Sequence, residues 1–334
     1  MGVTNLKNPN IDQNQLNKNL KLFIDFCKNS MVAHDVDPAI SYLNYMVERM
    51  EMNEEQVLWL CFLYGVTYQL PSAYLIWNEY PDLELAGIER LTNWWKDAQS
   101  RIPFQTDKMK QRKDFVKTVA SYQDLVGGSQ RAYFDDLLSD DDPQVNFDKL
   151  WTPLKTIAYF GRFSIWNWSQ ALKHVAGYNI EPTILMLGEP DSISFTDGLA
   201  YAFGLLDKVT QKVINPETGK KQKIHYKWSE EEKTDMENSC SALKKALKLD
   251  NFQLETLACA FKKIWRTHES RYVGYYNDRM ADDIRKTSGQ GWDGVDWQLL
   301  WDAREACVPK KYLHNNCGVN KAIFSFTPEQ KIYM

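Results

Sequence analysis

Two stretches hold the residues whose types and spacing could do chemistry. In the first, Arg162 lies among aromatic side chains in a segment with helical apolar spacing. An arginine in such a place is costly unless it pairs with a carboxylate or binds an anion. In the second, Asp197 lies in the turn-like sequence Ser-Phe-Thr-Asp-Gly, ahead of an apolar helix that we expect to begin near Leu199. We predict that Arg162 and Asp197 belong to one site that binds an anion.

The same stretches supply further polar groups. A helix start near Leu199 would add partial positive charge, which suits a phosphate held by Ser192, Ser194 and backbone amides. Ser164, two residues after Arg162, joins these candidate substrate contacts. A purely structural interpretation stays open, in which Asp197 caps the helix and Arg162 is its ion-pair partner.

Residues 96–117 form a basic segment with seven lysines and arginines against three aspartates. Aromatic residues lie beside it, and basic groups mixed with aromatics suit a nucleic-acid backbone with an unstacked base. The alternative is a solvated helix face. The candidate DNA contacts are Lys108, Lys110, Arg112 and Lys113. Asp107 is a candidate cap for a helix expected over 110–125.

A second polar and aromatic cluster spans residues 266–279. It concentrates arginines, tyrosines and one histidine, a mixture that serves acid/base chemistry or anion recognition. The alternative is a surface turn with ordinary ion pairs. The candidate residues here are His268, Arg271, Tyr275 and Arg279.

The elements that must position these residues are almost all helical. Helix-period apolar spacing recurs along the chain, and 44% hydrophobic residues in 334 suffice for a substantial core. We predict a mainly α protein: a flexible N-terminus over 1–15, one helical catalytic domain over 16–307, and a basic tail over 308–334. Six widely spaced cysteines without a CxxC motif indicate reduced thiols in a cytosolic protein.

One hairpin interrupts the helices. Residues 208–214 and 223–228 alternate in polarity around an Asn-Pro-Glu-Thr-Gly-Lys turn, so we predict a β-hairpin insertion over 206–228. Residues 208–228 carry six lysines against Glu217, a net charge of +5, although the whole chain is at −4. Either it contacts a phosphate backbone, or its lysines keep an exposed edge soluble.

Several of these motifs resemble a mainly phage-encoded family. The motifs that show the resemblance are Tyr-Phe-Gly-Arg-Phe-Ser-Ile-Trp at 159–166, Ile-Glu-Pro-Thr-Ile-Leu-Met-Leu-Gly at 180–188, the Ser-Phe-Thr-Asp-Gly-Leu turn at 194–199, Thr-Asp-Lys at 106–108 and Ser-Tyr at 121–122. The sequence is similar over roughly 55–280 to the amino acid:DNA transferases, grouped with the α-glutamyl/putrescinyl-thymine pyrophosphorylases. The hairpin and the tail do not fit that pattern.

The resemblance implies an enzyme that hypermodifies thymidine in DNA. An amine from an amino acid or polyamine would replace the (pyro)phosphate on phosphorylated 5-hydroxymethyluracil, in the cytoplasm of an infected bacterial cell. Such a reaction needs an extruded base, for which Trp166 or Tyr275 could form a wall. It also needs a cation for the leaving phosphate, Arg162 or Arg271, and a base for the amine. Asp197, Asp107 and His268 are the candidate bases; no metal or organic cofactor is required.

Two other classes of protein stay open. A helical, base-flipping DNA glycosylase would release free base from modified DNA, whereas the transferase would release phosphate and need an amine. A non-catalytic phage DNA-binding protein would show no turnover.

Overall fold

The computed structural model describes residues 13–189, 192–264 and 271–313, and confirms a mainly α-helical protein with one hairpin. The chain divides into two compact units. Among the described residues, unit 1 comprises 13–36, 183–264 apart from 190–191, and 271–275; unit 2 comprises 37–182 and 276–313. The single domain expected over 16–307 is thus shared between two compact units, and its catalytic unity stays a prediction.

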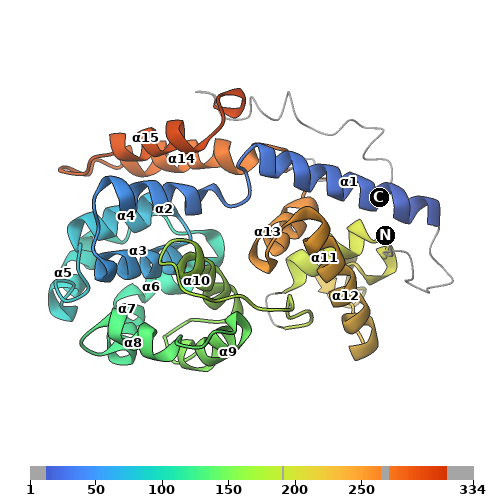
Figure 1. The fold of residues 1–334 in the computed structure, drawn as a ribbon, viewed down its shortest axis with the longest axis horizontal. Helices are drawn as coiled ribbons and strands as arrows, with labels where there is room; N and C mark the ends of the chain where they lie inside the picture. Colours follow the sequence, from blue (N-terminus) through green and yellow to red (C-terminus); the bar gives the residue numbers. More distant parts are fainter. Residues whose placement is uncertain (1–12, 190–191, 265–270, 314–334) are drawn as a thin grey trace. The chain divides into compact units, whose positions relative to one another are not determined.

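Unit 2 holds most of the helices (Figure 1). They are α2 (Pro38–Arg49), α3 (Glu54–Thr67), α4 (Leu70–Glu79), α5 (Ile88–Ala98), α6 (Met109–Lys113), α7 (Phe115–Val126), α8 (Gln130–Leu137), α9 (Pro143–Leu154), α10 (Arg162–His174), α14 (Tyr275–Ser288, whose first residue ends unit 1) and α15 (Gln298–Cys307), with the 3₁₀ turns η1 (Thr106–Lys108) and η3 (Lys310–Tyr312). The helix expected over 110–125 is two helices, α6 and α7, which meet at Asp114.

Helix α3 is the centre of unit 2. As its continuous apolar sequence predicts, every residue from Val57 to Thr67 is buried. Phe62 stacks on Tyr122 of α7 with ring centroids 3.8 Å apart, and meets Trp168 of α10 edge-on at 5.4 Å. At Gly65 an added Cβ would lie 2.8 Å from the Cβ of Trp168. The absence of a side chain at Gly65 therefore lets α10 pack directly against α3.

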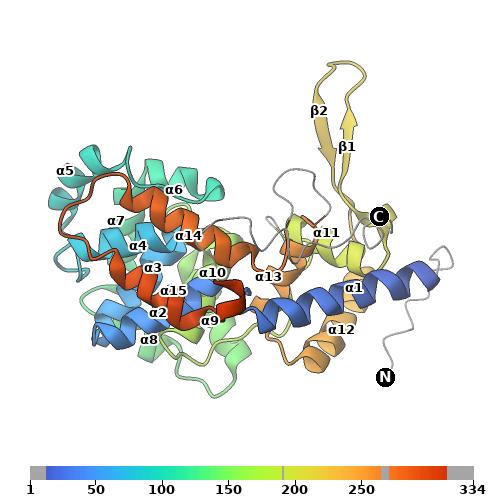
Figure 2. The same cartoon turned by 90° about the horizontal axis from the view of Figure 1, so that it is seen from above.

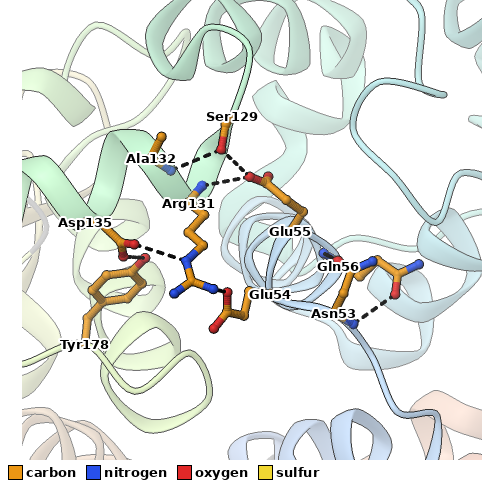
Figure 3. A network of polar contacts seen from close by, with 9 residues as sticks. All are labelled: Asn53, Glu54, Glu55, Gln56, Ser129, Arg131, Ala132, Asp135 and Tyr178. Atoms are coloured by element: carbon orange, nitrogen blue, oxygen red, sulfur yellow. Dashed lines mark hydrogen bonds and ion pairs between the residues drawn. The ribbon is translucent and has the colours of Figure 1, made fainter.

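The start of α3 is fixed by its caps (Figure 3). Asn53 and Gln56 form a reciprocal capping box, in which each side chain accepts from the backbone amide of the other residue. Glu55 accepts hydrogen bonds from the Ser129 hydroxyl at 2.5 Å and from the Arg131 amide at 3.0 Å, at the beginning of α8. Burial raises the pKa of Glu55, but these donors outweigh burial and hold the pKa below its usual value. The Glu55 charge thus ties α3 to the N-terminus of α8.

Unit 1 is a smaller helical layer. Its elements are α1 (Gln13–Val32), α11 (Ile193–Ala202), the 3₁₀ turn η2 (Leu206–Lys208), β1 (Gln211–Ile214), β2 (Lys221–Ile224), α12 (Glu230–Leu247) and α13 (Asn251–Phe261). Helices α11 and α13 pack most closely: an added Cβ at Gly198 would lie 1.9 Å from the Ala258 carbonyl oxygen. Helix α1 packs on this pair, and the Asn19 amide donates to the Tyr201 carbonyl at 3.0 Å.

The predicted hairpin is confirmed, with strands shorter than expected. Strands β1 and β2 pair antiparallel, with Lys212 opposite Lys223 and Ile214 opposite Lys221. The Asn215 side chain accepts hydrogen bonds from the amides of Glu217 and Thr218, which shapes the turn. Figure 2 shows the two strands as an arm that extends away from α11 and α13. Among the described residues no helix is long and apolar enough to cross a lipid bilayer.

Candidate active site

The start of α10 brings several buried polar groups of unit 2 together. Arg162 is the first residue of the helix and is only 4% exposed, with its guanidinium carbon 4.6 Å from the centre of the Trp166 ring. The helix begins after Gly161, whose lack of a side chain leaves no cap for the first amides. A buried cation and uncapped amides at one helix N-terminus together favour an anion.

Lys108 lies against the same helix turn. Its ammonium donates to the Ser164 hydroxyl at 2.6 Å and lies 4.7 Å from the centre of the Phe163 ring. Gln111 reaches the same hydroxyl at 3.2 Å and also donates to the Tyr159 carbonyl at 2.9 Å. Lys108 is fully buried, so it does not share a surface with Lys110 and Lys113, which are exposed. The structure therefore separates one member of the expected basic track from the others.

The backbone leading into this site is unusual at Tyr159. Its φ of 65° lies in the left-handed region, which residues with a side chain seldom adopt. The carbonyl of Tyr159 is held by Gln111, and two residues later Gly161 begins the helix. Arg162 and Ser164 both lie in the first turn of α10, which follows directly.

Asp197 of unit 1 is placed differently from the sequence prediction. Helix α11 begins at Ile193 and contains Asp197 in its middle, so both the helix start near Leu199 and the interpretation of Asp197 as its cap were wrong. Serine, threonine, aspartate and glycine favour turns locally, but close packing of α11 on α13 at Gly198 overrides that preference. Arg162, in unit 2, is not the ion-pair partner found for Asp197.

The carboxylate of Asp197 is fully engaged. One oxygen lies 2.6 Å from the Lys262 ammonium. The other accepts from both the amide and the hydroxyl of Thr210, each at 3.0 Å, and that hydroxyl also lies 3.1 Å from Nδ1 of His225. Asp197 thus joins α11, the end of α13 and the base of the hairpin. Lys262 and Thr210 carried no signal in the sequence, since neither is near Asp197 along the chain.

The comparisons with known proteins bear on this pair of stretches. The sequence pattern of the amino acid:DNA transferases matches residues 33–270, which include Lys108, Arg162 and Asp197. The chain belongs to the amino acid:DNA transferase family. This match confirms the family resemblance found in the sequence.

A relative of this chain is known by name. The chain is 30% identical over 277 residues to a protein of Salmonella phage ViI named serinyltransferase. The aligned part is 78% of this chain and 65% of the relative, so the chain spans just under two thirds of the relative's length. No solved structure matches the chain.

The remaining candidate residues lie on several different helices and turns. Arg112 donates three hydrogen bonds to the carbonyls of Gln99 and Ser100, which fastens α6 to the end of α5. Trp166 is buried and packs edge-on against Phe147 rather than forming an open wall. Asp107 is exposed within η1 and does not cap a helix, contrary to the structural expectation. The residue that caps η1 is Gln105.

In unit 1, Ser192 is buried before α11, and the Ser194 hydroxyl lies 3.2 Å from the Cys259 sulfur. Arg271 is buried with its guanidinium carbon 3.8 Å from the centre of the Tyr275 ring. Arg279, in unit 2, pairs with Asp283 at 3.6 Å. His268 lies outside the described residues. Gln111, which sequence reasoning missed, shares a helical face with Lys108 three positions earlier, and that spacing was the available signal.

Proposed function

We propose that this chain transfers an amino acid onto phosphorylated 5-hydroxymethyluracil in DNA. The amine nitrogen bonds to the exocyclic methylene carbon, the carbon–oxygen bond to phosphate breaks, phosphate or pyrophosphate leaves, and the amine gives its proton to a base. The observation that supports this function is the family match across residues 33–270, which includes the buried cations Lys108 and Arg162.

The leaving phosphate is assigned to the start of α10. Arg162 offers a planar fork of donors that fits phosphate oxygens. Lys108 supplies a second positive charge, because its ammonium donates to the hydroxyl of Ser164 in the same turn of α10. Fixed donors aimed at the leaving oxygen stabilise the charge that develops there. The aromatic surroundings of Arg162 lower the local dielectric and strengthen that stabilisation.

The proton of the amine is assigned to Asp107. Its carboxylate is exposed in η1, directly before Lys108 in the chain, and it takes part in no hydrogen bond or ion pair within the described ranges. Asp197, whose oxygens are held by Lys262 and Thr210, acts instead as a positioning residue. Lys110 and Lys113, both exposed, are assigned to the DNA backbone.

Serine is the first amine to test, because the phage relative is named serinyltransferase. The full chain is incubated with a duplex oligonucleotide carrying 5-(phosphoryloxymethyl)uracil or its pyrophosphate, with serine, other amino acids or putrescine. Release of phosphate or pyrophosphate and the mass of the digested nucleosides are measured. We expect an amine-dependent nucleoside adduct, whereas release of free base would show a glycosylase and overturn the proposal.

Two conservative variants test the residue assignments. Arg162→Lys keeps the charge but loses the fork, and should lower kcat by about 100-fold, in the range found for loss of one stabilising donor. Asp107→Asn should lower turnover by about 10²–10⁴-fold, the usual contribution of a general base. The matched control Asp136→Asn changes an exposed carboxylate of α8 and should leave turnover unchanged. Full activity in a folded Asp107→Asn protein removes Asp107 from the mechanism.

A further inference from the structure

In the hairpin arm, residues 208–228, the lysine at the base is paired with a carboxylate and the lysines further out are not. At its base the Lys208 ammonium pairs with Glu232 at 2.5 Å, and the Tyr226 hydroxyl donates to the same carboxylate at 2.9 Å. Beyond the base, five lysines are exposed and none forms an ion pair with the described residues: Lys212, Lys220, Lys221, Lys223 and Lys227. The only carboxylate of the arm is Glu217 in the turn.

The strand register gathers three of these lysines on one face. Lys212 is directly opposite Lys223, and Lys221 lies two residues before Lys223 on the same strand, so their side chains point the same way. Like charges directly opposite each other destabilise a strand pair, and a lone two-stranded hairpin is marginal to begin with. This arrangement is unfavourable for the arm alone and becomes favourable when an anion lies across the face.

The arm is nevertheless held firmly at its root. Thr210, directly before β1, donates twice to Asp197 of α11, and Asp197 is itself paired with Lys262 after α13. His225, directly after β2, meets the hydroxyl of Thr210. Two carboxylates at the root, Asp197 and Glu232, are occupied by these contacts. They hold the arm out from the helices as Figure 2 shows, without neutralising its outer face.

We propose that the face of the arm formed by Lys212, Lys221 and Lys223 binds the phosphate backbone of duplex DNA. Residues 208–228 carry +5 in a chain of −4, so the remaining residues together carry −9 and give DNA no net long-range attraction. A two-stranded β-ribbon also has the dimensions to lie along or within the major groove. The proposal relies on the proposed function only for the choice of DNA as the polyanion.

The test measures binding of the full chain to a fluorescent, unmodified 30-base-pair duplex between 50 and 200 mM NaCl, by anisotropy. The variant Lys212→Gln/Lys221→Gln/Lys223→Gln removes the charged face. The matched control Lys21→Gln/Lys28→Gln/Lys245→Gln removes the same charge from exposed lysines of α1 and α12 in unit 1. The variant Lys212→Arg/Lys221→Arg/Lys223→Arg keeps the charge, and unfolding curves are recorded for all three.

The arm variant should bind at least about tenfold more weakly at 100 mM NaCl. The slope of log K against log[NaCl] should become shallower by about 2–3, because each lost phosphate contact removes about 0.9. The control and the arginine variant should bind like the parent. Equal losses in the arm variant and the control would show only a net-charge effect and overturn the proposal.

Two further outcomes separate this inference from the proposed function. If the arm variant binds the duplex as tightly as the parent does, the arm assignment is wrong. If the parent also transfers amines, the proposed function still stands. If arm-dependent binding is found but no amine transfer, the proposed function is wrong and the arm assignment stands. Phosphatidylserine vesicles provide the competing anionic surface, and binding to them in preference to DNA would overturn the proposal.

Discussion

The Asp197 carboxylate lies 2.6 Å from the Lys262 ammonium, and this ion pair joins the middle of α11 to the end of α13. The Asp197 side chain is 5% exposed and that of Lys262 is 20% exposed. Removing one partner of such a pair leaves a partly buried charge without compensation. Asp197 therefore supports the fold of unit 1 and the root of the hairpin arm.

Asp197→Asn should destabilise the protein by about 1–3 kcal/mol, since asparagine still accepts from Thr210 but no longer neutralises Lys262. The measurement is urea unfolding followed by circular dichroism. Glu230→Gln is the control, because its pair with Lys233 is at the surface and should change stability by under about 0.5 kcal/mol. Equal unfolding midpoints for Asp197→Asn and the parent would contradict a structural role.

Gly198→Ala should be among the most destabilising substitutions in unit 1 that add a single heavy atom. The added methyl would overlap the Ala258 carbonyl oxygen, and backbone cannot move aside as a flexible side chain can. We expect a loss of roughly 2–4 kcal/mol in thermal or urea unfolding. Gly87→Ala is the control, because nothing lies within 4 Å of its added Cβ. A Gly198→Ala protein as stable as Gly87→Ala would refute the close packing of α11 on α13.

Glu55 should make stability depend on pH at the acidic end. Its pKa is lower in the folded protein than its usual 4.5, so its contribution is complete above that value and is lost as pH falls through the folded pKa. Glu55→Gln should be less stable than the parent at pH 7, and the difference should shrink below about pH 4.5. Melting temperatures at pH 3–7 measure it; a constant difference would show that the charge of Glu55 is not responsible.

Asp37 should have the opposite effect on stability. Burial raises its pKa to about 6, although the Tyr64 hydroxyl, 2.9 Å away, and the nearby His174 partly offset burial. Because the folded pKa is raised, stability falls as pH rises from about 4 to 6 and is then constant.

Asp37→Asn keeps the acceptor for Tyr64 and suits the left-handed backbone at φ 50°. It should raise stability at pH 7 by about 1–3 kcal/mol in urea unfolding. Below pH 4 the variant and the parent should be equally stable, which is the internal control. A variant that is less stable than the parent at pH 7 would show that the Asp37 charge is stabilising.

The sequence by itself determined the local elements. The capping box of Asn53 and Gln56, the fully apolar run of α3 and the lysine-rich hairpin depend on residues only a few positions apart. Such periodicity and capping involve residues within one or two helical turns of each other, so they can be predicted without knowledge of the fold. Membership of the amino acid:DNA transferase family could be predicted from the sequence for the same reason, because the motifs that indicate it are short and contiguous.

Only the tertiary structure decided what the candidate site residues contact. Asp197 meets Lys262 because Gly198 lets α11 approach α13, a packing between segments some sixty residues apart. Lys108 lies buried beside Ser164 rather than along the basic surface, because η1 packs on the first turn of α10. Local charge patterns cannot distinguish a solvated lysine from a buried one, since burial depends on which distant helices cover it.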